Sequence, residues 1–202
     1  MSHVSFTYNV AFTLPVNRDA SQPHLTPAEL WQGIKRGGRN PNDFASYVAG
    51  CEVLSGGRKR FRRRLTLSNG AVHTAAGQTL DQDVWIADML HVEATTVGTG
   101  AKSTFLLSWD AGDGDGDSGD GNDLYLTAMY ELKLDKVEPG SPEAREIETN
   151  YRSLARGACK TAVESIRQWK EQGLLQKWAD EDKILDAVET RGEQSYILCN
   201  EE

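Results

Sequence analysis

The sequence lacks the short motifs by which catalytic chemistry is most often recognised. Its 202 residues contain no GxSxG nucleophile elbow, no phosphate-binding loop and no dinucleotide-binding fingerprint. The three cysteines are widely spaced and odd in number, and no pair among the four histidines has a metal-ligand spacing. We therefore expect reduced thiols, no metal site and no bound cofactor.

Long hydrophobic runs are also missing. No segment approaches the roughly eighteen apolar residues that a membrane-spanning helix requires. The opening MSHVSFTYNV lacks the basic and apolar regions of a secretory signal, so a cytoplasmic protein is expected. The length and the 39% hydrophobic content predict one globular domain, residues 1–175, and an acidic extension, residues 176–202, that is helical or mobile.

Negative charge is concentrated in two segments. The net charge is −8; residues 110–123 hold six aspartates and no basic residue, and residues 176–202 hold eight acidic and three basic residues. The basic run RKRFRRR, residues 58–64, could suggest a nucleic-acid patch. A strand turns alternate residues to opposite faces, however, and no aromatic stacking platform accompanies the run, so we expect no nucleic-acid binding.

The acidic run DAGDGDGDSGDGND, residues 110–123, could be read as a calcium loop. In the EF-hand register that starts at Asp113, Ser118 takes the place of the glycine and Leu124 that of the closing glutamate. The nonapeptide calcium pattern needs tandem copies, and this segment occurs once. We therefore predict a long hairpin loop between two strands, with at most weak cation binding.

Strand-like and helical patterns follow one another along the chain. An alternating strand at residues 5–14 precedes two short helices, whose N-caps are Thr26 and Asn40, and Gly37 and Gly38 are expected to end the first of them. About six strands come next. Ser141 then caps one long helix, and the acidic tail contains a further amphipathic helix.

The apolar stripe of the long helix has small residues in its middle. Ala155, Ala158 and Ala162 stand where leucine would fill the space against a sheet. Their size either keeps a cavity open between helix and sheet or allows the two to touch closely. The spacing alone leaves both interpretations open.

This order of elements resembles the helix-grip fold of the START and birch-pollen-allergen-like (SRPBCC) superfamily, and within it the AtaL-like family. The resemblance rests on LTPAELWQGIKRGGRNPNDFASYVAGCEVL (25–54), DLYLTAMYEL (123–132) and the long helix, and it extends from about Val4 to Gln172. It implies an α+β fold in which a curved antiparallel sheet of about seven strands wraps around one long C-terminal helix, with two short helices after the first strand. It also implies a hydrophobic ligand cavity and, because some members lie beside biosynthetic genes, a role in secondary metabolism.

Strand alternation identifies polar residues that share an inward face with apolar ones. Arg63 has the parity of Phe61 and Leu65, and a buried guanidinium needs an anion or several acceptors. We interpret it as an anchor for a substrate carboxylate, enolate or phenolate; the alternatives are an internal ion pair and a register that turns it outward. Tyr130 and Tyr151 are candidate proton donors, or else core tyrosines with hydroxyls satisfied at the rim.

His91 and Glu93 have the composition of an acid–base pair. Parity places both on the outer face, because their strand is expected to bury Leu90, Val92 and Ala94. The candidate catalytic residues are therefore Arg63, Tyr130 and Tyr151. The candidate ligand-binding residues, which share the inward faces and the helical stripe, are Tyr8, Phe61, Gln78, Gln82, Leu90, Val92, Phe105, Trp109, Leu126, Ala128, Leu154, Ala158 and Ala162.

Three functions from different classes remain. The favoured one is a cofactor-independent cyclase or isomerase of small-molecule biosynthesis, which would fold a hydrophobic intermediate in the cavity and guide proton transfers. The alternative is a non-catalytic carrier of a lipid-like or pigment ligand. The third is an interaction module whose acidic segments dock a basic partner, and it would leave the cavity without a use. The expected partner is a hydrophobic small molecule, and the sequence indicates no oligomeric state.

Overall fold

The structure is a computed structural model that describes residues 5–69, 77–109 and 124–198, with side chains described up to residue 186 in the last helix. Its elements are β1 (Phe6–Pro15), α1 (Pro27–Arg39), the 3₁₀ turn η1 (Pro41–Asp43), β2 (Val48–Gly56), β3 (Arg60–Leu67), β4 (Thr79–Ala87), β5 (His91–Thr96), β6 (Lys102–Trp109), β7 (Leu124–Leu134), α2 (Pro142–Glu171) and α3 (Leu174–Leu198).

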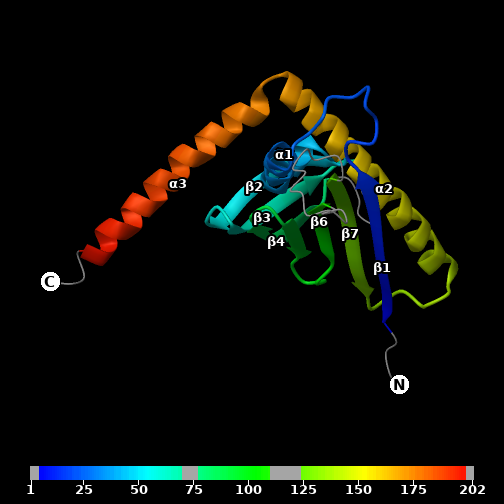
Figure 1. Cartoon of the computed structure of the whole chain (residues 1–202). Helices are drawn as coiled ribbons and strands as arrows, with labels where there is room; N and C mark the ends of the chain where they lie inside the picture. Colours follow the sequence, from blue (N-terminus) through cyan, green and yellow to red (C-terminus); the bar gives the residue numbers. More distant parts are fainter. Residues whose placement is uncertain (1–4, 70–76, 110–123, 199–202) are drawn as a thin grey trace.

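The seven strands form one antiparallel sheet in the order β1-β7-β6-β5-β4-β3-β2 (Figure 1). Consecutive strands from β2 to β7 are neighbours, so this part is a meander, and β1 returns to pair with β7. Trp109 at the end of β6 lies opposite Leu124 at the start of β7. The acidic run 110–123 therefore joins the ends of two paired strands, as predicted, while the run itself lies outside the described residues.

The helix α1 begins as its sequence predicts. The backbone N–H of Glu29 donates to Thr26 Oγ1 at 3.2 Å, and the Glu29 carboxylate accepts from the N–H of Thr26 at 2.9 Å, which completes a capping box. The prediction of a second short helix is wrong in extent, because only the 3₁₀ turn η1 forms. Asn40, its predicted cap, makes no side-chain capping bond and instead ends α1, donating its backbone N–H to the carbonyl of Arg36 at 2.8 Å.

The long helix α2 packs chiefly on β1 and β7, at one end of the sheet. Ser141 caps it by accepting from the N–H of Ala144 at 3.1 Å, and it ends before Gly173, whose positive φ of 70° favours glycine. The shorter α1 lies against α2 and against β4, β5 and β6. The middle strands β3 to β6 are not among the main contacts of α2. The predicted helix-grip α+β architecture is confirmed.

The last helix, α3, turns back past α1 and then extends away from the body of the protein (Figure 1). Leu175 near its start is buried at 4% exposure. Within the part of the chain that the structure describes, no helix is both long enough and apolar enough to cross a membrane.

Candidate functional site

A cavity of about 920 Å³ lies between α2 and the inner face of the sheet. Its walls come from β3, β4, β5, β6 and β7, from the end of α1 with the following segment to β2, and from the middle of α2. This volume is within the range of small-molecule sites, which are mostly apolar with a few polar groups that orient the ligand. Along part of the α2 stripe, the small alanines therefore border an open cavity between helix and sheet.

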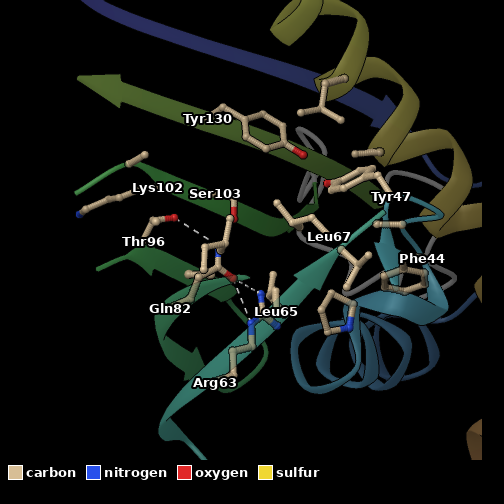
Figure 2. A pocket seen from close by; sticks show the side chains of 18 of the residues that line it. Phe44, Tyr47, Arg63, Leu65, Leu67, Gln82, Thr96, Lys102, Ser103 and Tyr130 are labelled. Carbon is tan, nitrogen blue, oxygen red and sulfur yellow. Dashed lines mark hydrogen bonds between the residues drawn. The ribbon is translucent and has the colours of Figure 1, made fainter. Parts of the chain in front are cut away.

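Arg63 is the charged residue buried in the wall of this cavity, with an exposure of 5%. Its Nε and Nη2 atoms donate to the amide oxygen of Gln82 at 3.0 and 2.7 Å, and its Nη1 donates to the backbone carbonyl of Gly38. Gln82 in turn donates to the hydroxyl of Thr96 at 3.4 Å. Figure 2 shows this row of polar side chains along the middle strands.

The Arg63 cation has neutral protein partners only. None of the ion pairs among the described residues includes it, and all three of its hydrogen bonds go to uncharged oxygens. Burial lowers the pKa of Arg63 to about 10, so the side chain is still charged at neutral pH. Both alternatives considered from the sequence, an internal ion pair and an outward register, are wrong in the structure.

Three tyrosines form a second polar group in the cavity wall. Tyr47 and Tyr130 lie close enough to affect each other's ionisation, and the nearby Tyr47 adds to the effect of burial in raising the pKa of Tyr130. Figure 2 shows the two hydroxyls turned toward each other. The ring of Tyr151 meets that of Tyr130 edge-on, with 5.6 Å between the centroids.

All three phenols are held in the protonated form at neutral pH. Burial is the largest cause in each case: it raises the pKa of Tyr47, raises that of Tyr130 well above its ordinary value and raises that of Tyr151 to about 12. A phenol that keeps its proton can donate a hydrogen bond, and it cannot act as a base at neutral pH. The tyrosine group is therefore suited to a carbonyl or an oxyanion.

Two glycines near the end of α1 let the cavity wall close. The sequence suggested that Gly37 and Gly38 end the helix, but α1 continues to Arg39 and buries both glycines. A Cβ on Gly37 would lie 1.8 Å from the ring of Phe44, and one on Gly38 would lie 2.7 Å from Val92. Because these two residues lack a Cβ, Phe44 and Val92 can pack directly against α1. The same close packing brings the Gly38 carbonyl to Arg63.

Half of the predicted site residues line the cavity. The three candidate catalytic residues do so, together with five of the candidate ligand-binding residues. These eight residues are Arg63, Tyr130, Tyr151, Gln82, Val92, Phe105, Leu154 and Ala158.

The eight other predicted ligand-binding residues do not line this cavity. Four are covered by other parts of the fold. Leu126, Ala128 and Ala162 are buried where α2 touches the sheet, and Phe61 is buried below the Arg39 guanidinium, 5.5 Å from its ring centroid. Parity correctly assigned their inward direction but does not indicate which inward residues a helix covers.

The remaining four lie near the ends of strands or beneath the start of α2. Tyr8 donates to the Glu148 carbonyl at 3.3 Å, outside the cavity. Gln78 is exposed just before β4, Leu90 is 49% exposed in the β4–β5 turn, and Trp109 is 56% exposed at the end of β6. Alternation carries no information about burial where a strand leaves the body of the sheet.

His91 and Glu93 lie on the outer face of the sheet, as parity predicted. His91 packs edge-on against Trp85, with 4.7 Å between ring centroids, and Glu93 pairs with Lys102 at 3.5 Å. The described residues contain no group of three metal-ligating side chains. Cys51 and Cys159 are free thiols, and burial raises the pKa of Cys159 to about 11, which leaves it unreactive.

Sequence reasoning missed Tyr47 and Phe44, which both line the cavity. They belong to the irregular segment between η1 and β2, where neither strand nor helix periodicity applies. Phe44 stacks on Trp169 of α2 with 5.0 Å between ring centroids. The signal that could have indicated them is the presence of two aromatic residues in a short segment that connects two elements of the core.

Comparison with solved structures supports the same fold. The chain superposes on Zhui, an aromatase/cyclase from Streptomyces sp. R1128, with a TM-score of 0.50 and 11% identity, covering 85% of this chain and 96% of that one. It superposes on the di-domain ARO/CYC BexL of the BE-7585A pathway with a TM-score of 0.52 and 10% identity, covering 82% of this chain and 51% of that one. The chain thus spans about half the length of BexL, and at these identities the likeness concerns the fold.

Comparison with known sequences is more specific. A relative from Aspergillus terreus, "Acetylaranotin biosynthesis cluster protein L", is 45% identical over 175 residues, which is 85% of this chain and 96% of the relative. The family model described as "AtaL: Acetylaranotin biosynthesis cluster protein L" matches residues 10–173. This range contains the sheet from Val10 of β1 onward, α1, the residues that line the cavity and all of α2. The chain belongs to the AtaL family.

Proposed function

We propose that this protein is a cofactor-independent enzyme of secondary-metabolite biosynthesis, a cyclase or isomerase that acts on a hydrophobic intermediate in the cavity. The observation that carries the proposal is Arg63, a cation with 5% exposure in the cavity wall that has no acidic partner among the described residues. Neutral acceptors offset only part of the cost of burying a cation, so an anionic group of a ligand would bind favourably beside Arg63. The relative named for a biosynthesis cluster and the fold of the aromatase/cyclases support the same conclusion.

The chemistry proposed for this site is carbon–carbon bond formation or proton shift through an enolate. The substrate loses a proton from an acidic carbon to water, the enolate carbon attacks a carbonyl carbon of the same molecule, and the new alkoxide takes a proton from a tyrosine, which water then reprotonates. Arg63 would stabilise the enolate oxygen, and Tyr130 or Tyr151 would donate to the carbonyl oxygen. The step is balanced in protons and electrons, so no redox partner is required.

The polar groups of the cavity also narrow the substrate class. No histidine lies among the described residues that line it, and the Asp81 carboxylate is bound by Arg64 at 2.7 and 2.9 Å. The tyrosines are protonated, so the described lining of the cavity contains no strong base. The substrate would therefore have a carbon acid of its own, such as a CH₂ group between two carbonyls, and would be long enough to fold back on itself.

The absence of a strong base from the described cavity lining favours a second candidate function. In this function the protein is a carrier that binds a hydrophobic molecule with an anionic or carbonyl end and performs no chemistry. In that case Arg63 and the tyrosines would serve recognition only. The two candidates predict the same ligand contacts and differ in whether turnover occurs.

Arg63→Met distinguishes the two candidates. For an enzyme that uses Arg63 against a developing oxyanion, turnover should fall by about 10²–10³; for a carrier, only ligand affinity should fall. Arg62→Met is the matched control, because Arg62 belongs to the same strand but pairs with Asp83 at 2.7 Å on the exposed face. The substrate class is first identified by native mass spectrometry of protein purified from its own source. Full turnover of the Arg63 variant would remove Arg63 from the mechanism.

A further inference from the structure

The helix α3 packs behind the cavity, although it lies beyond the residues that match the AtaL family. The family match ends at residue 173, and α3 begins at Leu174. Figure 1 shows α3 passing α1 before it extends away from the body. Its described contacts are made by its first turns, with α1, with the end of α2 and with the β2–β3 turn.

Asp182 is the polar centre of this contact. Its carboxylate accepts from the Arg58 guanidinium at 2.6 Å and from the Gln32 amide at 3.0 Å, and it forms an ion pair with Lys35. Its side chain is only 22% exposed, and the Lys35 and Gln32 bonds lower its pKa despite the opposing effect of burial. Asp182 thus ties α1, through Gln32 and Lys35, to the β2–β3 turn, through Arg58.

From Arg58 a short series of contacts leads to the cavity. The backbone carbonyl of Arg58 accepts a hydrogen bond from the guanidinium of Arg39, the last residue of α1. Gly38 precedes Arg39 in the chain, and its backbone carbonyl accepts a hydrogen bond from Arg63 in the cavity wall. Movement of the end of α1 away from the β2–β3 turn would therefore withdraw one of the acceptors that orient Arg63.

A second series of contacts, made by aromatic side chains, reaches the same wall. Trp178 of α3 meets Trp169 of α2 edge-on at 5.3 Å between centroids, and the Arg36 guanidinium lies 4.9 Å from the Trp178 ring centroid. Trp169 stacks on Phe44, which lines the cavity and fills the space above Gly37. Both series of contacts end on the segment from Gly37 to Phe44.

We propose that Asp182 is a positioning residue for the ligand cavity: by joining α1 to the β2–β3 turn, it holds the Gly38 carbonyl and hence the Arg63 guanidinium in the orientation that receives an anionic oxygen of the ligand. The inference deepens the proposed function and rests on the role given there to Arg63. It does not depend on turnover, because it concerns how Arg63 is held.

The test compares two apolar fluorescent probes, the anion 8-anilinonaphthalene-1-sulfonate and the neutral N-phenyl-1-naphthylamine, on the full chain. Asp182→Asn should weaken binding of the anion relative to the neutral probe by about two- to thirty-fold, the range of mutations that act through a neighbouring element. Asp180→Asn is the matched control. It removes the same charge from α3, and Asp180 bonds only Gln176 and Lys183 of its own helix, each at 3.0 Å.

A purely structural role of Asp182 predicts a different result, because loosening of the fold would weaken both probes alike. The double variant Asp182→Asn with Arg63→Met separates the positioning role from a general loosening of the fold. If Asp182 acts through Arg63, the preference for the anionic probe should fall no further in the double variant than in Arg63→Met alone. Hydrogen exchange gives an independent measurement: amides of residues 36–44 should exchange faster in Asp182→Asn and not in Asp180→Asn.

The outcomes distinguish this inference from the proposed function. If Arg63→Met lowers the preference for the anionic probe and Asp182→Asn leaves it unchanged, the positioning role is wrong and the role of Arg63 stands. If Arg63→Met itself leaves the preference unchanged, or if the parent protein binds neither probe, the anion site and the positioning role both fail.

Discussion

Ala158 and Ala162 lie one turn apart on α2 but meet different surroundings. Ala158 lines the cavity and is half-buried, whereas Ala162 is completely buried where the helix touches the sheet. Beside Ala162, the thiol of Cys159 is 3.3 Å from the carbonyl oxygen of Phe12, which shows how closely α2 approaches β1. The alanine stripe therefore serves both uses that the sequence allowed, at different positions.

This difference predicts that substitution of alanine by leucine has a different effect on stability at the two positions. Ala158→Leu should extend into the cavity, leave the free energy of unfolding nearly unchanged and obstruct an apolar probe. Ala162→Leu should overpack the core and cost about 1–3 kcal/mol. Denaturant midpoints and probe titrations of the two variants provide the comparison. An equal loss of stability in both variants would mean that the space beside Ala158 is filled in solution.

The glycines of α1 and α2 form a second matched pair. Gly37→Ala places a Cβ 1.8 Å from the Phe44 ring, which is stacked on Trp169, so we expect a loss of about 1–3 kcal/mol and altered probe binding. Gly157 is solvent-exposed at the edge of the cavity; in Gly157→Ala the new Cβ meets no atom within 4 Å and should stabilise the helix by roughly 0.5–1 kcal/mol. Thermal unfolding checks both, and a stabilising Gly37→Ala would contradict the packing described for Phe44.

Alkaline pH should destabilise the protein through Tyr151. Its pKa is raised by burial to about 12, above the ordinary value of 10.0, so the folded state keeps the proton that the unfolded state loses. The resulting stability is fully present below about pH 10 and is lost as the pH rises through about 12, a change on the order of 2 kcal/mol. Tyr151→Phe should lessen this loss in urea titrations between pH 9 and 12. An identical pH dependence in the variant would show that Tyr151 titrates normally.

The acidic run 110–123 should be dispensable. β6 and β7 are already paired up to Trp109 and Leu124, so deletion of residues 112–121 with a short turn in their place should leave the sheet and probe binding intact. Calcium titration of the parent protein should reveal no site tighter than about millimolar. A micromolar calcium isotherm that disappears with the deletion would restore the calcium interpretation.

The sequence predicted the architecture because its signals are local. Strand alternation depends only on which face a residue takes, and the capping box at Thr26 is completed within one turn of helix. The same parity correctly directed Arg63 inward and placed His91 on the outer face. The short helix predicted after Asn40 forms only as the 3₁₀ turn η1, and Asn40 also serves as the C-cap of α1.

The composition of the cavity required the tertiary structure. Leu126 and Tyr130 share one face of β7, yet α2 covers Leu126 and leaves Tyr130 at the cavity, and no residue pattern within β7 encodes where the helix packs. Tyr47 reaches the cavity from an irregular segment, and its hydroxyl faces that of Tyr130, more than eighty residues away in the sequence (Figure 2). Local periodicity determined which way the side chains of the sheet point, and the packing of helices over the sheet decided which of them remain open to a ligand.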